Sequence, residues 1–209
     1  MEQAVIGILD LGMGNLRSLS NAIEHNGFDV AVTESHAAFD GFTHLIIPGV
    51  GHWRAAMGAV FERQLRPQIQ AFAASGRPVL GVCLGMQLLA AMGTEGGEME
   101  GLGLVPGTVR KLEPGPAFRI PHVGWNSLTK KKDHPVYEGL KQDRDFYFVH
   151  SFAMQCDDPA DVLGETDYGG LVTAAVAHAN VVGFQFHPEK SEASGLKLLE
   201  NFCLWDGRC

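Results

Sequence analysis

Cysteine is scarce in this sequence, and the cysteines present are not spaced for a shared structural role. Four occur among 209 residues, at Cys83, Cys156, Cys203 and Cys209, and no two of them form a Cys-x-x-Cys pair. This spacing favours neither a zinc site nor a disulfide scaffold. We therefore expect no metal, no cofactor and a location in a reducing compartment, the cytoplasm.

Long apolar runs and an excess of positive charge are also missing. No stretch approaches the roughly 20 apolar residues that cross a bilayer. Residues 1–10 lack a basic region, so we expect a strand there rather than a signal peptide. Lysine and arginine total 16 against 24 acidic residues, a net charge of −8, which argues against a nucleic-acid partner. The sequence thus predicts binding to neither membrane nor nucleic acid.

The first half of the chain alternates predicted strands with predicted helices. Hydrophobic residues make up 45% of the sequence, enough for a full core. Apolar runs predict strands at residues 4–11, 29–33, 44–47 and 78–82. Apolar periodicity predicts helices at 16–24 and at 53–72, the latter broken in two at Pro67. Such alternation is typical of a parallel sheet with helices packed on it.

The second half is richer in short strands. They are predicted at residues 108–112, 124–128, 146–150, 162–166, 174–178 and 181–186, with a tight hairpin turn at Ala179-Asn180. Residues 93–103, rich in Gly and Glu, are expected to form an exposed loop, and residues 195–202 the last helix. We predict one α/β domain over residues 1–209, with a mixed, mostly parallel central sheet flanked by helices.

One segment, Gly81-Val82-Cys83-Leu84-Gly85-Met86-Gln87, has the form of a nucleophile elbow with Cys in place of Ser. An apolar run precedes it, and another at residues 88–92 follows, so we expect a strand, a sharp corner and a helix. Amide groups at the start of a helix favour the thiolate form of a cysteine placed there and can bind an oxyanion. The alternative is a core cysteine at the end of a strand, since free cysteine is among the most buried residue types, and the elbow alone does not decide between them.

A second motif, Gln185-Phe186-His187-Pro188-Glu189, supplies the groups that a cysteine nucleophile needs. An imidazole must exchange the proton, and a carboxylate must fix the tautomer of that imidazole. Residues two apart in extended chain project to the same side, so His187 and Glu189 can lie together there. A strand-end histidine beside a solvated glutamate is the alternative. Together with the elbow, the motif favours a Cys83-His187-Glu189 triad.

These motifs, with Pro48-Gly49-Val50-Gly51, resemble those of class I (triad) glutamine amidotransferases. The resemblance extends from Asp10 to the last helix. Within the family, the chain is similar to the glutaminase subunits that serve a cyclase in histidine biosynthesis. Segments 121–126 and 147–152 resemble motifs of those subunits. Pro48-Gly49-Val50-Gly51 separates the chain from anthranilate synthase subunits, which usually carry Pro-Gly-Pro-Gly there. Phe152 is a mild departure from the resemblance, because Tyr is commoner at its position.

The resemblance implies a flavodoxin-like fold and hydrolysis of L-glutamine to glutamate and ammonia. It implies that Cys83 attacks the side-chain amide, that His187 protonates departing ammonia and that Glu189 orients His187. The implied oxyanion donors are the amide of Leu84 and one from Gly49, Val50 or Gly51. The implied contacts to the amino-acid end of glutamine are Gln87, Glu95, His150, Ser151 and Phe152.

The resemblance also implies a partner, a (β/α)8-barrel cyclase subunit that receives the ammonia within a heterodimer. The residues expected to face this partner are Met13, Asn15, Ser18, Trp125 and Lys190. Two other functions stay open at this point: a glutaminase serving a different synthase, and a non-catalytic regulatory subunit. His122 also has two interpretations, a residue adjoining the site or a hydrogen-bonded structural histidine.

Overall fold

Two sheets organise the computed structural model, which describes residues 4–141 and 144–208. Within these residues the larger sheet has nine strands in the order β2-β1-β3-β4-β13-β12-β11-β8-β9. Its strands are β1 (Val5–Leu9), β2 (Asp29–Thr33), β3 (His44–Gly49), β4 (Val79–Cys83), β8 (His122–Lys130), β9 (Arg144–His150), β11 (Val162–Asp167), β12 (Leu171–His178) and β13 (Val181–Phe184). The four pairs from β2 to β13 are parallel and the four remaining pairs are antiparallel. The sheet is therefore mixed, as expected, but it is not mostly parallel, because the strands of the second half pair antiparallel, as β12 and β13 do across their tight hairpin.

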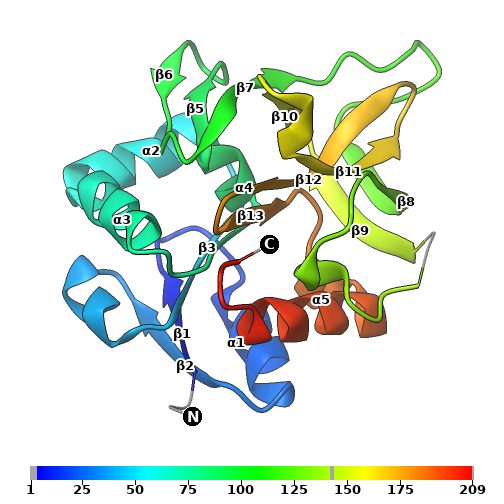
Figure 1. The fold of residues 1–209 in the computed structure, drawn as a ribbon. Coiled ribbons are helices and arrows are strands. Elements are labelled where there is room, and N and C mark those ends of the chain that lie inside the picture. The colour runs from blue at the N-terminus through cyan, green and yellow to red at the C-terminus, as the bar shows by residue number, and fades with distance from the viewer. Residues whose placement is uncertain (1–3, 142–143, 209) are drawn as a thin grey trace.

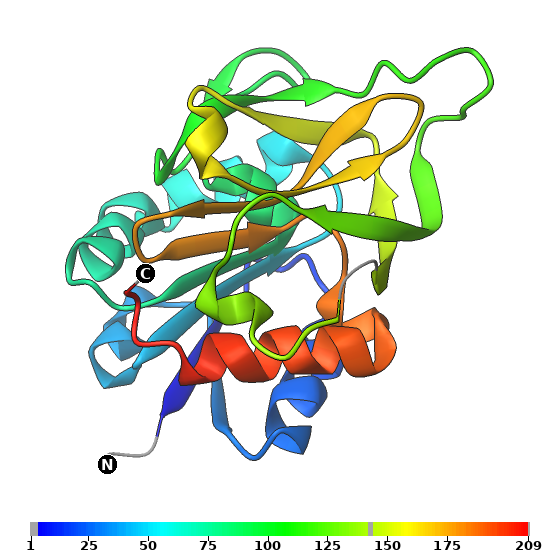
Figure 2. The same cartoon turned by 45° about the vertical axis from the view of Figure 1, so that its right-hand side comes forward.

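The helices cover both faces of the sheet (Figures 1 and 2). They are α1 (Leu16–His25), α2 (Trp53–Glu62), α3 (Leu65–Ala74), α4 (Leu84–Leu88) and α5 (Glu192–Leu204). Alternation along the buried strands creates a core on each face: in β3, Ile46 packs with the core that includes α1 and α5, whereas Leu45 and Ile47 pack with the core that includes α2 and α3. The α/β class with helices flanking a mixed sheet is confirmed.

A second, smaller sheet lies at the top of the molecule in both views (Figures 1 and 2). Its order is β10-β7-β5-β6, formed by β5 (Ala90–Gly93), β6 (Met99–Glu100), β7 (Val105–Lys111) and β10 (Phe152–Cys156). Two predictions are wrong here. The apolar run 88–92 is expected to be helical, but α4 ends at Leu88 and the run continues as β5. The segment 93–103 is expected to be an exposed loop, but it contains β6 and the buried Leu102.

The helical region 53–74 is divided in two, as predicted, but not at the predicted residue. The break falls at Gln64, which has a left-handed backbone conformation with φ 53°. Pro67 lies instead in the first turn of α3, where a missing backbone N–H leaves no helical hydrogen bond unmade. The hairpin turn at Ala179-Asn180 is confirmed, because His178 pairs with Val181 across it. No helix in the described part of the chain is long and apolar enough to cross a membrane.

Candidate active site

The corner between β4 and α4 presents Cys83. The residue has φ 55° and ψ −112°, a strained conformation for a residue with a side chain. Gly85 makes the corner possible, since a Cβ atom there would lie 1.6 Å from the carbonyl oxygen of Ile47. Strand β3 therefore lies directly against the first turn of α4, and Gly49 is the register partner of Cys83.

Cys83 opens onto a cavity of about 320 Å³, within the roughly 300–1,000 Å³ typical of small-molecule sites. Most residues predicted for the site line this cavity: Cys83, His187, Leu84, Val50, Gly51, Gln87, Glu95, His150, Ser151, Phe152 and Lys190. Gly49 and Glu189 lie behind it, lining a much smaller cavity that His187 also borders. A larger cavity of about 1090 Å³ is lined by none of these residues.

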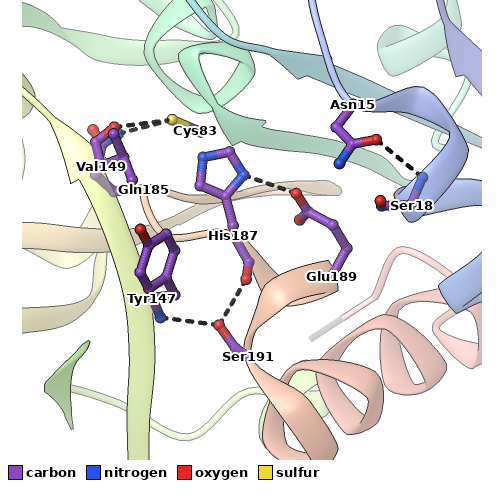
Figure 3. A network of polar contacts seen from close by, with 9 residues as sticks. All are labelled: Asn15, Ser18, Cys83, Tyr147, Val149, Gln185, His187, Glu189 and Ser191. Atoms are coloured by element: carbon purple, nitrogen blue, oxygen red, sulfur yellow. Dashed lines mark hydrogen bonds and ion pairs between the residues drawn. The ribbon is translucent and has the colours of Figure 1, made fainter. Parts of the chain in front are cut away.

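His187 and Glu189 lie side by side, but not by the predicted route. Strand β13 ends at Phe184, and Pro188–Lys190 form a 3₁₀ turn rather than extended chain. This turn brings Nδ1 of His187 within 2.8 Å of Oε1 of Glu189, and the two side chains are only 5% and 4% exposed. The imidazole lies between Cys83 and Glu189 (Figure 3).

The charge of His187 is set by two opposing effects. Burial by itself lowers the pKa of the imidazole, but the neighbouring Cys83 and Glu189 side chains outweigh it and raise the pKa to about 9. At neutral pH the ring is therefore an imidazolium held by a carboxylate. It has a proton to give to a leaving group on the Cys83 side.

Ser191 fixes the turn that carries His187, a role that no motif in the sequence indicates. Its hydroxyl donates to the carbonyl oxygen of His187 at 2.6 Å and accepts from the amide of Tyr147 at 3.0 Å (Figure 3). The amide of His187 in turn donates to the carbonyl oxygen of Tyr147 at 2.9 Å. Ser191 is almost fully buried, and its two hydrogen bonds join β9 to the chain at His187. Its position four residues after His187 is the only sequence signal.

The predicted oxyanion donors other than Leu84 lie at the end of β3 and just beyond it, next to the elbow. Gly49 is buried within β3, whereas Val50 is 40% exposed and Gly51 has φ 108° with no atom within 4 Å of where a Cβ atom would lie. The segment beyond is anchored, because the amide of Trp53 donates to Oε2 of Glu95 at 2.7 Å. Glu95 thus both lines the cavity and caps the start of α2. Val50 and Gly51 lie beyond the end of β3, and Gly51 has more open surroundings than Gly49, where a Cβ atom would lie 3.2 Å from Leu84.

Side-chain amides and backbone carbonyl groups form a hydrogen-bonded network at and behind the cavity wall. Nε2 of Gln87 donates to the carbonyl oxygen of Phe152 at 2.9 Å and to Oε1 of Gln185 at 3.1 Å. Gln185 then donates to Sγ of Cys83 at 3.9 Å, while Sγ donates to the carbonyl oxygen of Val149 at 3.7 Å (Figure 3). Gln185 is fully buried, and the sequence motifs assign it no role. It connects Gln87 with the thiol of Cys83.

The residues predicted to face a partner lie outside the cavity, except Lys190 at its edge. Lys190 is exposed, and its ammonium lies 5.9 Å from the ring centre of Tyr147. Trp125, 50% exposed, contacts the same ring edge-on at 6.0 Å. Asn15 is exposed, and its side chain caps α1 by accepting from the amide of Ser18 at 3.3 Å; Met13 and Ser18 are half-buried.

Within residues 4–141 and 144–208, nothing outside this site supports metal or thiol chemistry. The described residues contain no cluster of His, Cys, Asp and Glu suited to a metal ion. Cys156 and Cys203 are free thiols whose pKa burial raises to about 12, so they are unreactive near neutral pH. Cys209 lies outside the described residues.

Comparison with known proteins finds relatives that match nearly the whole chain. A family model described as "Glutamine amidotransferase class-I" matches residues 7–205. The imidazole glycerol phosphate synthase subunit HisH of Sulfurimonas denitrificans is 45% identical over 201 residues, 95% of this chain and 97% of that protein. Subunit HisH 2 of Nitrobacter winogradskyi is 44% identical over 210 residues, 97% and 99% of the two chains.

Solved structures support the fold alone. A crystal structure of a glutamine amidotransferase has a TM-score of 0.75 at 22% identity, covering 95% of this chain and 99% of the other. The structure of PurLQS from Thermotoga maritima has a TM-score of 0.75 at 20% identity, covering 98% of each.

Proposed function

Because this chain belongs to the class-I glutamine amidotransferase family, we propose that Cys83, His187 and Glu189 are the triad with which it hydrolyses L-glutamine to glutamate and ammonia. One observation supports the triad above all: an imidazolium bound to Glu189 at 2.8 Å lies beside Cys83 at the wall of the cavity. The full-length relatives assign the chain as the glutaminase subunit of imidazole glycerol phosphate synthase, in histidine biosynthesis.

The chemistry follows from these three side chains. The Cys83 thiolate forms a bond to the side-chain amide carbon of glutamine, and the amide oxygen becomes an oxyanion. His187 gives its proton to the nitrogen as the carbon–nitrogen bond breaks, which releases ammonia and leaves a thioester. Water then adds to the thioester with His187 as base, and glutamate and the thiolate are released. Glu189 holds His187 in one tautomer and stabilises its charged form.

The oxyanion requires donors at the elbow and on the neighbouring strand. The amide of Leu84 follows the nucleophile at the corner, as in other elbow sites. A second amide comes from Gly49, Val50 or Gly51, and Val50–Gly51 is where the backbone can turn at least cost. Loss of one such donor costs about 100- to 1,000-fold in kcat. Gln87, Glu95, His150, Ser151 and Phe152 receive the amino-acid end of glutamine.

A synthase subunit must receive the ammonia, because free ammonia is protonated in water at neutral pH and no longer a nucleophile. We propose a (β/α)8-barrel cyclase as this partner, in a cytoplasmic heterodimer. The face of this chain that docks to the cyclase is the exposed apolar side of the β8–β9 pair. There Val123 lies opposite Val149, and Trp125 lies opposite Tyr147. Lys190 lies at the edge of this face and of the cavity, and an acidic residue of the partner pairs with it. Met13, Asn15 and Ser18 extend the face.

The test compares two sources of ammonia. In the complex with the cyclase, Cys83→Ala abolishes product formation from glutamine but leaves product formation from added ammonium salt unchanged. Cys156→Ala, a matched control at a cysteine outside the cavity, retains both activities. Glutamine-dependent turnover by Cys83→Ala would refute the triad, and a wild-type chain inactive with glutamine in every synthase complex would favour a regulatory role.

A further inference from the structure

His122 lies directly behind the proposed glutamine site without lining it. It is the first residue of β8, it is 2% exposed, and its register partner on β9 is His150, which does line the cavity. The two rings are joined by a hydrogen bond of 3.0 Å between Nδ1 of His122 and Nε2 of His150. When two neutral imidazoles share a hydrogen bond, one ring donates its N–H and the other accepts with its unprotonated nitrogen.

Asn126 determines which nitrogen of His122 carries the proton. Its Oδ1 accepts from the amide of Ser127 at 2.8 Å, and its Nδ2 donates to the carbonyl oxygen of Asp167 at 2.8 Å. The side-chain amide is thereby oriented, and its nitrogen also contacts Nε2 of His122 at 3.4 Å. Since an amide nitrogen only donates, Nε2 of His122 accepts and the proton of His122 lies on Nδ1.

The same logic extends to the cavity wall. His122 donates from Nδ1 to Nε2 of His150, so the proton of His150 also lies on Nδ1. That proton is donated to the carbonyl oxygen of Phe152 at 2.8 Å. The Phe152 oxygen accepts in addition from Gln87. Every donor in the chain from Asn126 to Phe152 meets an acceptor, with both histidines neutral.

The surroundings keep this chain in place and uncharged. The His122 ring is stacked between the rings of Phe148 and Tyr168. Its centre lies 4.7 Å from that of Phe148 and 3.9 Å from that of Tyr168, and the ring planes differ by 16° and 21° respectively. Gly124, between His122 and Asn126 on the same face of β8, has no side chain to separate them. Burial lowers the pKa of both His122 and His150 to about 4, which keeps them neutral at physiological pH.

We propose that His122 is a positioning residue for glutamine binding, which holds His150 in the Nδ1–H tautomer and through it the backbone at Phe152. The carbonyl of Ser151 is already taken by the amide of Leu112 at 2.9 Å. The carbonyl of Phe152 is instead held by two side chains, His150 and Gln87, so the His150 bond is one of the two that orient this part of the wall. The inference rests on the proposed function, in which residues 150–152 receive the amino-acid end of glutamine.

Three variants separate positioning from packing. His122→Phe keeps a ring between Phe148 and Tyr168 but has no donor, whereas His122→Asn can place an amide donor near the position of Nδ1. Tyr168→Phe is the matched control, because it keeps the stack and loses only a bond from the phenol to the carbonyl oxygen of Arg119.

The first measurement is alkylation of Cys83 by a chloromethyl ketone analogue of glutamine, followed over a range of concentrations. In His122→Phe the half-saturating concentration rises about tenfold, which corresponds to about 1.4 kcal/mol, and the rate at saturation changes little. His122→Asn recovers most of the affinity and Tyr168→Phe behaves as wild type. In the complex with the cyclase, KM for glutamine follows the same order while kcat changes less. Unchanged saturation in His122→Phe, or equal impairment in His122→Asn, would overturn the inference.

The second measurement needs no activity, so it distinguishes failure of this inference from failure of the proposed function. Nitrogen NMR of the chain labelled in histidine shows both His122 and His150 protonated at Nδ1 and unprotonated at Nε2. An Nε2–H tautomer at either ring would refute the chain of hydrogen bonds. Absence of any Cys83 alkylation in the wild type would instead count against the proposed triad.

Discussion

Replacement of Glu189 by Gln tests how the carboxylate of the proposed triad controls the charge of His187. The pKa of His187 is about 9 in the folded protein against 6.5 for an ordinary histidine. A raised pKa means that the native state binds the proton more tightly than the unfolded chain does. The resulting stabilisation is complete below about pH 6.5, declines as the pH rises and is lost above about pH 9. At 1.36 kcal/mol per pKa unit it amounts to about 3 kcal/mol.

In Glu189→Gln the buried ring loses its carboxylate but not its burial, which lowers its pKa. The pKa of His187, followed by NMR titration, therefore falls by more than one unit. In the wild type, the free energy of unfolding measured in urea declines between pH 6 and 9.5 as His187 loses its proton. In Glu189→Gln most of this decline disappears. Glutaminase kcat in the complex falls by about 100- to 10,000-fold. Glu192→Gln, the same charge change at an exposed residue, leaves all three unchanged. An unaltered pKa of His187 in Glu189→Gln would refute the reasoning.

Three further predictions concern the elements that support the triad. The methyl group of Gly85→Ala clashes with the backbone of β3 and destabilises the protein by about 1–3 kcal/mol or more. The control Gly58→Ala, in open space on α2, stabilises the protein by about 0.5–1 kcal/mol. Thermal unfolding of the two variants checks this prediction, and equal melting temperatures would contradict it. Ser191→Ala leaves the amide of Tyr147 without its acceptor and costs about 1–3 kcal/mol in urea unfolding, so wild-type stability would show that this bond is not needed. Gln87→Leu removes the second donor to the cavity wall and raises the glutamine KM about tenfold or more, and an unchanged KM would exclude Gln87 from binding.

The sequence alone is sufficient for the elements whose physics is local. The elbow can be predicted because close contacts around Cys83 tolerate only glycine at Gly85, and that requirement is visible as a spacing. The hairpin at Ala179-Asn180 and the amphipathic α1 are likewise local patterns of turn residues and apolar periodicity. The residues of the candidate triad follow from equally short motifs, each no longer than seven residues.

Prediction fails where neighbouring elements decide between two local possibilities. The apolar run 88–92 fits a helix or a strand equally well, and it becomes β5 because it pairs with β6 and β7. Gly93 is packed against the ring of Trp53, with 2.3 Å between a hypothetical Cβ and the indole, so the segment expected to be exposed is held against α2.

Taken alone, the amino-acid sequence is therefore enough to identify the chemistry: a thiol at a glycine-flanked corner, an imidazole and a carboxylate two residues apart, and a family to which they belong. The geometry of these groups depends on tertiary contacts. Parallel pairing of β4 with β13 brings Cys83 to His187 across more than a hundred residues, and a 3₁₀ turn pinned by Ser191 places Glu189. Hydrogen-bond direction between His122 and His150 is likewise invisible in sequence, because a proton's position depends on partners from other strands.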